Sequence, residues 1–179
     1  MRQRGITLAA IAIGLATAPA QANEPLAFKG MTLGAPATAI TQDPRFDCRN
    51  VKTPTADLVC TLRPKQLETL AGAPLISLYY FFDRARLTGV TANLPESQFE
   101  TVRTALETKY GIATIHTETI KTLSGKSFEN RTLSWQASHG KLELQRYAGQ
   151  VNRSLLRLTD EQAATRIRER QLKPASQDI

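Results

Sequence analysis

The stretch that decides the fold is LISLYYFF, from Leu75 to Phe82. It is almost entirely apolar and rich in aromatic residues, which is typical of a strand that is central in a sheet or covered on both faces. Asp83-Arg84-Ala85-Arg86 follows as a turn, and residues 87–92 return as a partner strand. These two runs predict an antiparallel hairpin at the centre of the fold.

An amphipathic helix is predicted over residues 95–110. Four apolar side chains recur at helical spacing and share one face: Phe99, Val102, Leu106 and Tyr110. Gly111 follows as a C-terminal cap. We expect the apolar face of this helix to pack on the sheet that contains residues 75–82.

The rest of the chain predicts one α+β domain over residues 23–172. Further strands are expected at 57–62, 113–123, 132–137, 141–147 and 154–158, with a first strand or entry segment at 28–34. Residues 35–40 predict a short helix, residues 45–56 a loop, and residues 161–172 a last helix opened by Thr159-Asp160-Glu161-Gln162. The fold class is therefore an antiparallel sheet of five to seven strands with two or three helices packed on it and one disulfide. Residues 173–179 predict a mobile polar tail.

Residues 1–22 have the pattern of a secretory signal peptide. Arg2 and Arg4 precede an apolar run from Ile6 to Leu15, and Ala20-Gln21-Ala22 supplies a small-x-small cleavage site. The alternative is a membrane anchor, but spanning a bilayer takes about 20 apolar residues. No cysteine lies near the cleavage site, which argues against a lipoprotein. We therefore expect a periplasmic protein that is soluble after cleavage of its signal.

The charge balance favours anionic partners. The chain has 23 Lys and Arg against 16 Asp and Glu, and removing Arg2 and Arg4 with the signal leaves 21 − 16 = +5. A mildly basic exported protein suits an envelope protein or an anionic membrane surface as partner, although basic charge also serves solubility. Nucleic acid is not expected in this compartment.

Cys48 and Cys60, the two cysteines of the chain, are expected to form a disulfide. An even count in an oxidising compartment favours that bond, which would close a short loop. The alternatives are two unrelated buried thiols or half of a zinc site. The zinc site lacks a second pair of ligands at suitable spacing.

The sequence predicts no catalytic, metal or cofactor site, and we expect a protein that is not an enzyme. The histidines are His116, in a Thr-rich strand, and His139, in a Ser-His-Gly turn. Neither accompanies a Gly-x-Ser-x-Gly elbow or a spaced cluster of metal ligands. Both are interpreted as exposed residues without a catalytic role.

Two surfaces are candidates for binding. The first is basic and would serve an anionic partner: Arg153, Arg157, Arg166, Arg170 and Lys173. Few apolar residues hold the last helix, so its charge would be available to a partner. The alternative is an ordinary solvated helix, balanced by Glu161 and Glu169.

The second candidate surface is aromatic and consists of Tyr79, Tyr80 and Trp135. Strand alternation places Tyr79 with Phe81 on one face and Tyr80 with Phe82 on the other. One face should be core. The other is either a ligand or partner surface or is covered by the second β region, and coverage is the favoured reading.

The chain resembles small uncharacterised periplasmic proteins of proteobacteria. The resemblance rests on Phe28-Lys29-Gly30-Met31-Thr32-Leu33-Gly34 before the cysteine pair, on Phe81-Phe82-Asp83-x-x-x-Leu87 before a helix ending Lys109-Tyr110-Gly111, and on the Trp135 strand before Arg146-Tyr147. The order of elements is also similar to outer-membrane assembly lipoproteins of the BamE/SmpA type and to β-lactamase-inhibitor-like architecture, although the lipoprotein cysteine is absent. This resemblance implies an α+β fold and a binding role, with no catalytic residues.

The leading hypothesis is a non-catalytic periplasmic binding, adaptor or inhibitor protein. The alternatives are a carrier of a small ligand or lipid and an envelope enzyme with an unrecognised site. A deep apolar pocket would favour the carrier, an exposed aromatic patch the protein binder, and a cleft of converging carboxylates or histidine the enzyme.

Overall fold

The computed structural model describes residues 25–175 except positions 54 and 123, and describes side chains as far as Arg170. The predicted signal peptide, residues 1–22, therefore lies outside the described residues, as does most of the predicted tail. The last helix runs to Ala175 rather than to residue 172.

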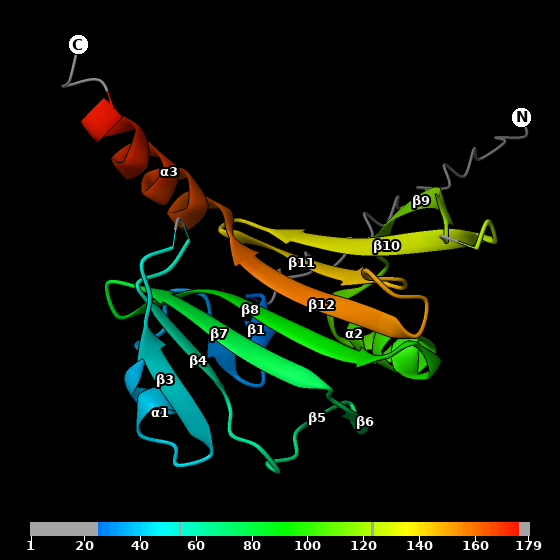
Figure 1. Ribbon diagram of the computed structural model, residues 1–179, viewed down its shortest axis with the longest axis horizontal. Helices are drawn as coiled ribbons and strands as arrows, with labels where there is room; N and C mark the ends of the chain where they lie inside the picture. Colours follow the sequence, from blue (N-terminus) through cyan, green and yellow to red (C-terminus); the bar gives the residue numbers. More distant parts are fainter. Residues whose placement is uncertain (1–24, 54, 123, 176–179) are drawn as a thin grey trace, which may run out of the picture.

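One antiparallel sheet of eight strands forms the body of the molecule (Figure 1). In spatial order its strands are β3 (Phe46–Asn50), β4 (Leu58–Leu62), β7 (Ser77–Asp83), β8 (Arg86–Pro95), β12 (Arg153–Asp160), β11 (Gly140–Gln145), β10 (Ser127–Ala137) and β9 (Thr114–Lys121). The predicted antiparallel sheet is confirmed, and the predicted maximum of seven strands is wrong.

The helices are few. They are α1 (Thr38–Thr41), a 3₁₀ turn η1 (Glu96–Gln98), α2 (Phe99–Tyr110) and α3 (Glu161–Ala175). Two short hairpins complete the described chain: β1 (Ala27–Phe28) with β2 (Met31–Thr32), and β5 (Thr69–Leu70) with β6 (Ala73–Pro74).

The strand missed by the sequence prediction is β3, which lies within the loop expected at residues 45–56. Its sequence, FDCRN, alternates apolar and polar residues only over Phe46–Cys48 and then ends in two exposed polar residues, which is too short a pattern to predict a strand. As an edge strand it also carries an ion pair between Arg49 and Asp47. Pairing with β4 places Cys48 directly opposite Cys60. The predicted disulfide is confirmed, with an S–S distance of 2.04 Å. Closing so short a loop stabilises the fold by about 3 kcal/mol in the chain-entropy model.

The central hairpin is β7 and β8, as predicted. Leu78, Tyr80 and Phe82 are buried on one face of β7, which we call the closed face of the sheet. Tyr79 and Phe81 lie on the other, open face, and Tyr79 is 37% exposed. The alternation inferred from LISLYYFF is therefore correct.

The second β region does not cover the open face, contrary to the favoured expectation. Strands β9 to β12 instead extend the same sheet, because β12 pairs with β8 along its length. Sheet growth satisfies the backbone groups at the edge of β8, which a second layer would leave unpaired.

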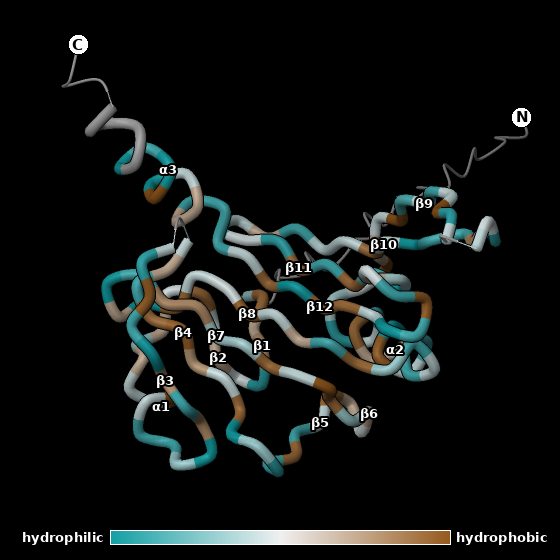
Figure 2. The backbone as a smooth tube through the Cα atoms, viewed as in Figure 1, coloured by the Kyte–Doolittle hydropathy of each residue, from teal (hydrophilic) through white to brown (hydrophobic). Residues whose placement is uncertain are grey.

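Helix α2 covers the closed face and carries both apolar and polar segments (Figures 1 and 2). Phe99, Val102 and Leu106 are buried, and they join Leu78 in one hydrophobic cluster. The end of the helix is fixed from β10, where the Trp135 Nε1 donates a hydrogen bond of 2.8 Å to the Gly111 carbonyl. The predicted apolar face is confirmed for Phe99, Val102 and Leu106, whereas Tyr110 is half-buried and the helix begins at Phe99 rather than at residue 95.

Candidate functional site

Helix α3 leaves the end of β12 and extends beyond the sheet (Figure 1). Asp160 caps its first turn by accepting a hydrogen bond of 2.8 Å from the Ala163 amide. Ala163 and Ile167 are its buried apolar residues, and neither belongs to the main hydrophobic cluster. The helix is therefore an appendage with a small contact area of its own.

Polar contacts hold α3 at two places. The Arg170 Nη2 lies 2.6 Å from the Asp83 Oδ2 at the end of β7. At the β10–β11 turn, Gln162 Nε2 lies 2.9 Å from His139 Nδ1, and the Gln136 amide donates to Glu161. The charge of Arg170 thus serves the fold, contrary to the expectation that this helix keeps its charges for a partner.

A groove of about 600 Å³ lies between α3 and the turn that joins β7 to β8. Four arginines line it: Arg84 and Arg86 from the turn, and Arg166 and Arg170 from α3. We call this the arginine groove. The acidic residues of its lining are Asp83, Asp160 and Glu169.

The groove lining has one more arginine than carboxylates, and two of its three carboxylates have contacts of their own. Asp83 forms an ion pair with Arg170. Asp160 caps α3, and its carboxylate lies 3.9 Å from the Arg166 guanidinium. Within the described part of the chain Arg84 has no ion pair, and Arg86 contacts the Gly34 carbonyl at 3.3 Å. The groove therefore presents guanidinium groups that can bind carboxylate or phosphate oxygens.

The turn that positions Arg84 is strained. Three hairpins of the structure turn on two residues with positive φ: Lys29-Gly30, Ala71-Gly72 and Arg84-Ala85. Glycine normally fills such turns because a side chain in the left-handed region costs about 1–2 kcal/mol. The β7–β8 turn is the one of these three without glycine, with φ of 51° at Arg84 and 58° at Ala85.

Neighbouring segments enforce this conformation. The Arg84 amide donates to the Asp57 Oδ2 at 2.8 Å, and the Ala85 carbonyl accepts from the Ala37 amide at 3.0 Å. Backbone strain that is held from outside is typical of functional sites. Here it fixes the backbone of Arg84 beside the groove.

A second, more apolar groove of about 320 Å³ lies on the other side of α3, on the open face. Phe81, Val90, Ala164 and Ile167 contribute to its lining, together with Arg157. Phe81 also stacks on Tyr79, with ring centroids 6.5 Å apart. The open face thus carries a small aromatic patch next to α3.

The predicted basic surface is only partly assembled. Arg166 and Arg170 meet in the arginine groove, whereas Arg157 lies in the apolar groove across α3. Arg153 begins β12 opposite Pro95, at the strand end far from α3. The Lys173 side chain lies outside the described residues.

The sequence prediction missed Arg84 and Arg86, which the hairpin brings to α3. The signal that could have found them is the pair of arginines at Arg84, in the two-residue turn, and Arg86, the first residue of the strand that follows it.

The predicted aromatic surface needs a larger correction. Tyr80 is 3% exposed, between Phe28 and Phe46, and burial raises the pKa of its hydroxyl. Trp135 is 5% exposed and donates a hydrogen bond to the Gly111 carbonyl just after α2. Both are core residues because strand alternation turns them to the closed face. Tyr79 alone remains exposed.

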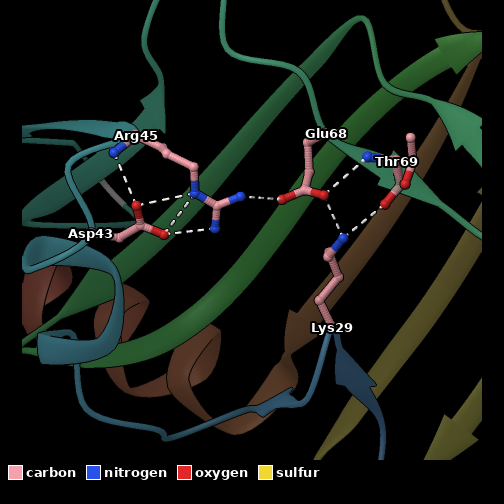
Figure 3. Close-up of polar contacts among 5 residues, drawn as sticks. All are labelled: Lys29, Asp43, Arg45, Glu68 and Thr69. Carbon is pink, nitrogen blue, oxygen red and sulfur yellow. Dashed lines mark hydrogen bonds and ion pairs between the residues drawn. The ribbon is translucent and has the colours of Figure 1, made fainter.

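A separate ion-pair network joins three segments of the chain and shares no residue with the lining of either groove (Figure 3). Glu68 accepts hydrogen bonds from Lys29 at 2.5 Å and Arg45 at 3.2 Å, and Arg45 also pairs with Asp43 at 2.7 Å. The Lys29 Nζ further donates to the Thr69 carbonyl. Each charge has a partner, so the network ties together three loops and leaves no group free for chemistry.

The described residues contain no group of three or more His, Cys, Asp or Glu placed to hold a metal ion. His116 and His139 are exposed, as predicted. None of the helices in the described ranges combines the length and apolar character needed to cross a membrane. Comparison with protein-family models, curated proteins and solved structures finds no match to this chain.

Proposed function

We propose that this protein is an exported, non-catalytic binding protein that takes an acidic segment of an envelope protein into the arginine groove. The observation that carries the proposal is the convergence of four arginines, from α3 and from the β7–β8 hairpin, on one groove. The hairpin itself does not require arginine at position 84, since Lys29 and Ala71 hold the equivalent positions of the other two turns.

The shape of the site favours a polypeptide segment over a membrane. The arginines approach from two sides, α3 and the β7–β8 turn, and so could contact carboxylates along an extended chain. A flat bilayer would contact only the rims. The half-exposed Tyr79–Phe81 patch beside α3 supports the same class of partner, because aromatic residues are enriched in protein interfaces.

Export is part of the proposal. The disulfide between Cys48 and Cys60 supports an oxidising compartment. N-terminal sequencing of protein recovered from the periplasm is expected to begin at Asn23. Recovery of an intact Met1 form from the cytoplasm would contradict export.

The binding test uses mature protein and a labelled oligoglutamate peptide, followed by fluorescence anisotropy. Arg84→Ala is expected to weaken binding several-fold. An exposed ion pair contributes about 0.2–1 kcal/mol, and an ion pair to a well-ordered guanidinium contributes somewhat more. Binding should weaken further as salt is raised, because the Debye length is about 8 Å at physiological ionic strength.

Arg153→Ala is the matched control, since it removes the same charge at the far end of β12. Equal losses in both variants would show that only net charge matters, and the site would be wrong. Vesicles of phosphatidylglycerol form the second arm. Binding to vesicles but not to the peptide would replace the protein partner with a membrane surface.

The apolar groove favours a second candidate, a carrier of a small anionic amphiphile, with Arg157 beside its head group. The volume of about 320 Å³ suffices for a small ligand. Titration with a fluorescent fatty acid distinguishes the two functions: Ile167→Ala should weaken fatty-acid binding in a carrier, and Arg84→Ala should not.

A further inference from the structure

Strand β9 is an edge strand that is exposed along nearly its whole length. It pairs with β10 alone, and of its eight residues only Ile120 is half-buried. Ile115 is 56% exposed, and Ile112 just before the strand is 93% exposed. A long exposed edge is a template for another strand, and proteins usually shorten it or protect it with charge.

The opposite edge, β3, shows such protection. That strand has five residues, and Arg49 and Asp47 place a charged pair on it. Strand β9, with the sequence TIHTETIK, holds a single carboxylate at Glu118 and a lysine only at its end. The two edge strands of the sheet therefore differ in length and in charge. The longer and less charged one, β9, is the edge that is free to pair with another strand.

From the self-complementarity of this strand we infer that β9 pairs antiparallel with β9 of a second copy of the chain. Two antiparallel copies that continue one sheet are related by a two-fold axis perpendicular to it, which lies midway between the two copies of one residue, so that this residue faces itself. Two registers pair all but one residue of the strand. One is centred on Thr117 and the other on Glu118.

Charge separates these two registers. Centring on Glu118 would set that carboxylate against its own copy, which is unfavourable for like charges on paired strands. Centring on Thr117 sets Glu118 of one copy opposite His116 of the other, twice. The Asn130 amide donates to the Glu118 Oε1 at 3.1 Å and holds the carboxylate on this face. The Thr117 register also covers Ile115 with Thr119 of the other copy.

The pairing can be trapped covalently. In the Thr117 register, Thr117 faces its own copy, at a separation that suits a disulfide. The native cysteines are both in the Cys48–Cys60 bond, so an introduced cysteine is the sole free thiol. We therefore expect the Thr117→Cys variant to form a disulfide-linked dimer rapidly under mild oxidation of concentrated protein.

The control is Thr119→Cys, which places a thiol on the same face of the same strand. In the Thr117 register it faces Ile115 of the other copy, so its dimer should form at least about tenfold more slowly. A mixture of Ile115→Cys and Thr119→Cys proteins should instead give the mixed dimer in excess over either homodimer.

The Tm of each reduced cysteine variant is measured first, and a Tm equal to that of wild type shows that the cross-linking reports on folded protein. Equal slow rates for Thr117→Cys and Thr119→Cys would overturn the inference, because random collision would then explain both. Faster cross-linking at Thr119 would overturn the register and the charge argument with it.

Discussion

At the scale of single residues, the β7–β8 turn joins local strain to the arginine groove. Arg84 and Ala85 both adopt left-handed backbone conformations, and hydrogen bonds from Ala37 and to Asp57 hold them. Of these two turn residues, Arg84 lines the groove and Ala85 does not. The strain at Ala85 should therefore be separable from function.

Ala85→Gly is therefore expected to stabilise the protein by about 1 kcal/mol, because glycine adopts a φ of 58° without steric cost. Urea unfolding measures the change. Ala105→Gly, in the middle of α2, is the control and should instead destabilise by about 1 kcal/mol. A loss of stability in both variants would show that the turn is not strained.

The ion-pair network of Figure 3 predicts a pH dependence. Burial raises the pKa of Glu68, but hydrogen bonds from Lys29 and the Thr69 amide outweigh it, and the pKa is lowered overall. A carboxyl with a lowered folded-state pKa stabilises the fold above its unfolded-state pKa, about 4.3, and that stabilisation is lost as the pH falls through the folded-state value.

Glu68→Gln should therefore lower the Tm at neutral pH, and the difference from wild type should shrink on acidification through that range. Thermal unfolding across the pH series measures it. Glu129→Gln, which removes an exposed ion pair with Arg131, should differ little from wild type throughout. Coinciding curves for Glu68→Gln and wild type would show that the network does not stabilise the fold, and a constant difference would show that its contribution does not depend on the ionisation of Glu68.

At the scale of elements, α3 is the least firmly attached helix. Its buried residues Ala163 and Ile167 lie outside the main cluster, so the sheet does not depend on them. Ile167→Asp is expected to release α3, with faster amide hydrogen exchange over residues 161–170 and little change in the exchange of β7 and β8.

Val102→Ala, in the main core, is the comparison variant. It should reduce protection across the whole sheet, because its side chain belongs to the cluster that all the central strands share. If Ile167→Asp instead lowers protection in β7 as much as Val102→Ala does, α3 is part of the core and not an appendage.

Elements with a strong periodic pattern could be predicted from the sequence. LISLYYFF gave the central strand with the correct faces, and the spacing of Phe99, Val102 and Leu106 gave α2. Strand β3 was missed because its apolar alternation is limited to Phe46 and Cys48, and its place in the sheet comes from pairing with β4 and from the disulfide.

At the scale of the whole molecule, the site depends on sheet order, which local patterns do not contain. Arg166 and Arg170 share a helix and were predicted as one surface. Arg84 and Arg86 join them only because β12 pairs with β8 and delivers α3 to the β7–β8 turn. The same pairing separates Arg153 from the groove.

The whole molecule thus presents two surfaces with different expected partners. The arginine groove would receive an acidic segment, and the β9 edge would receive a second copy of the chain. They lie at different places in the sheet order, since β9 is the edge strand and the groove adjoins β7 and β8. Binding at one should therefore be measurable without loss of the other.

The most direct test of the central claim is nuclear magnetic resonance mapping of the mature protein with the oligoglutamate peptide. The account predicts amide shift changes that cluster at the β7–β8 turn and on α3, at residues 83–87 and 160–170, and that need several-fold more peptide to saturate in Arg84→Ala. Shift changes spread over exposed basic residues such as Arg49, Arg131 and Arg153, with none concentrated at the turn, would contradict it.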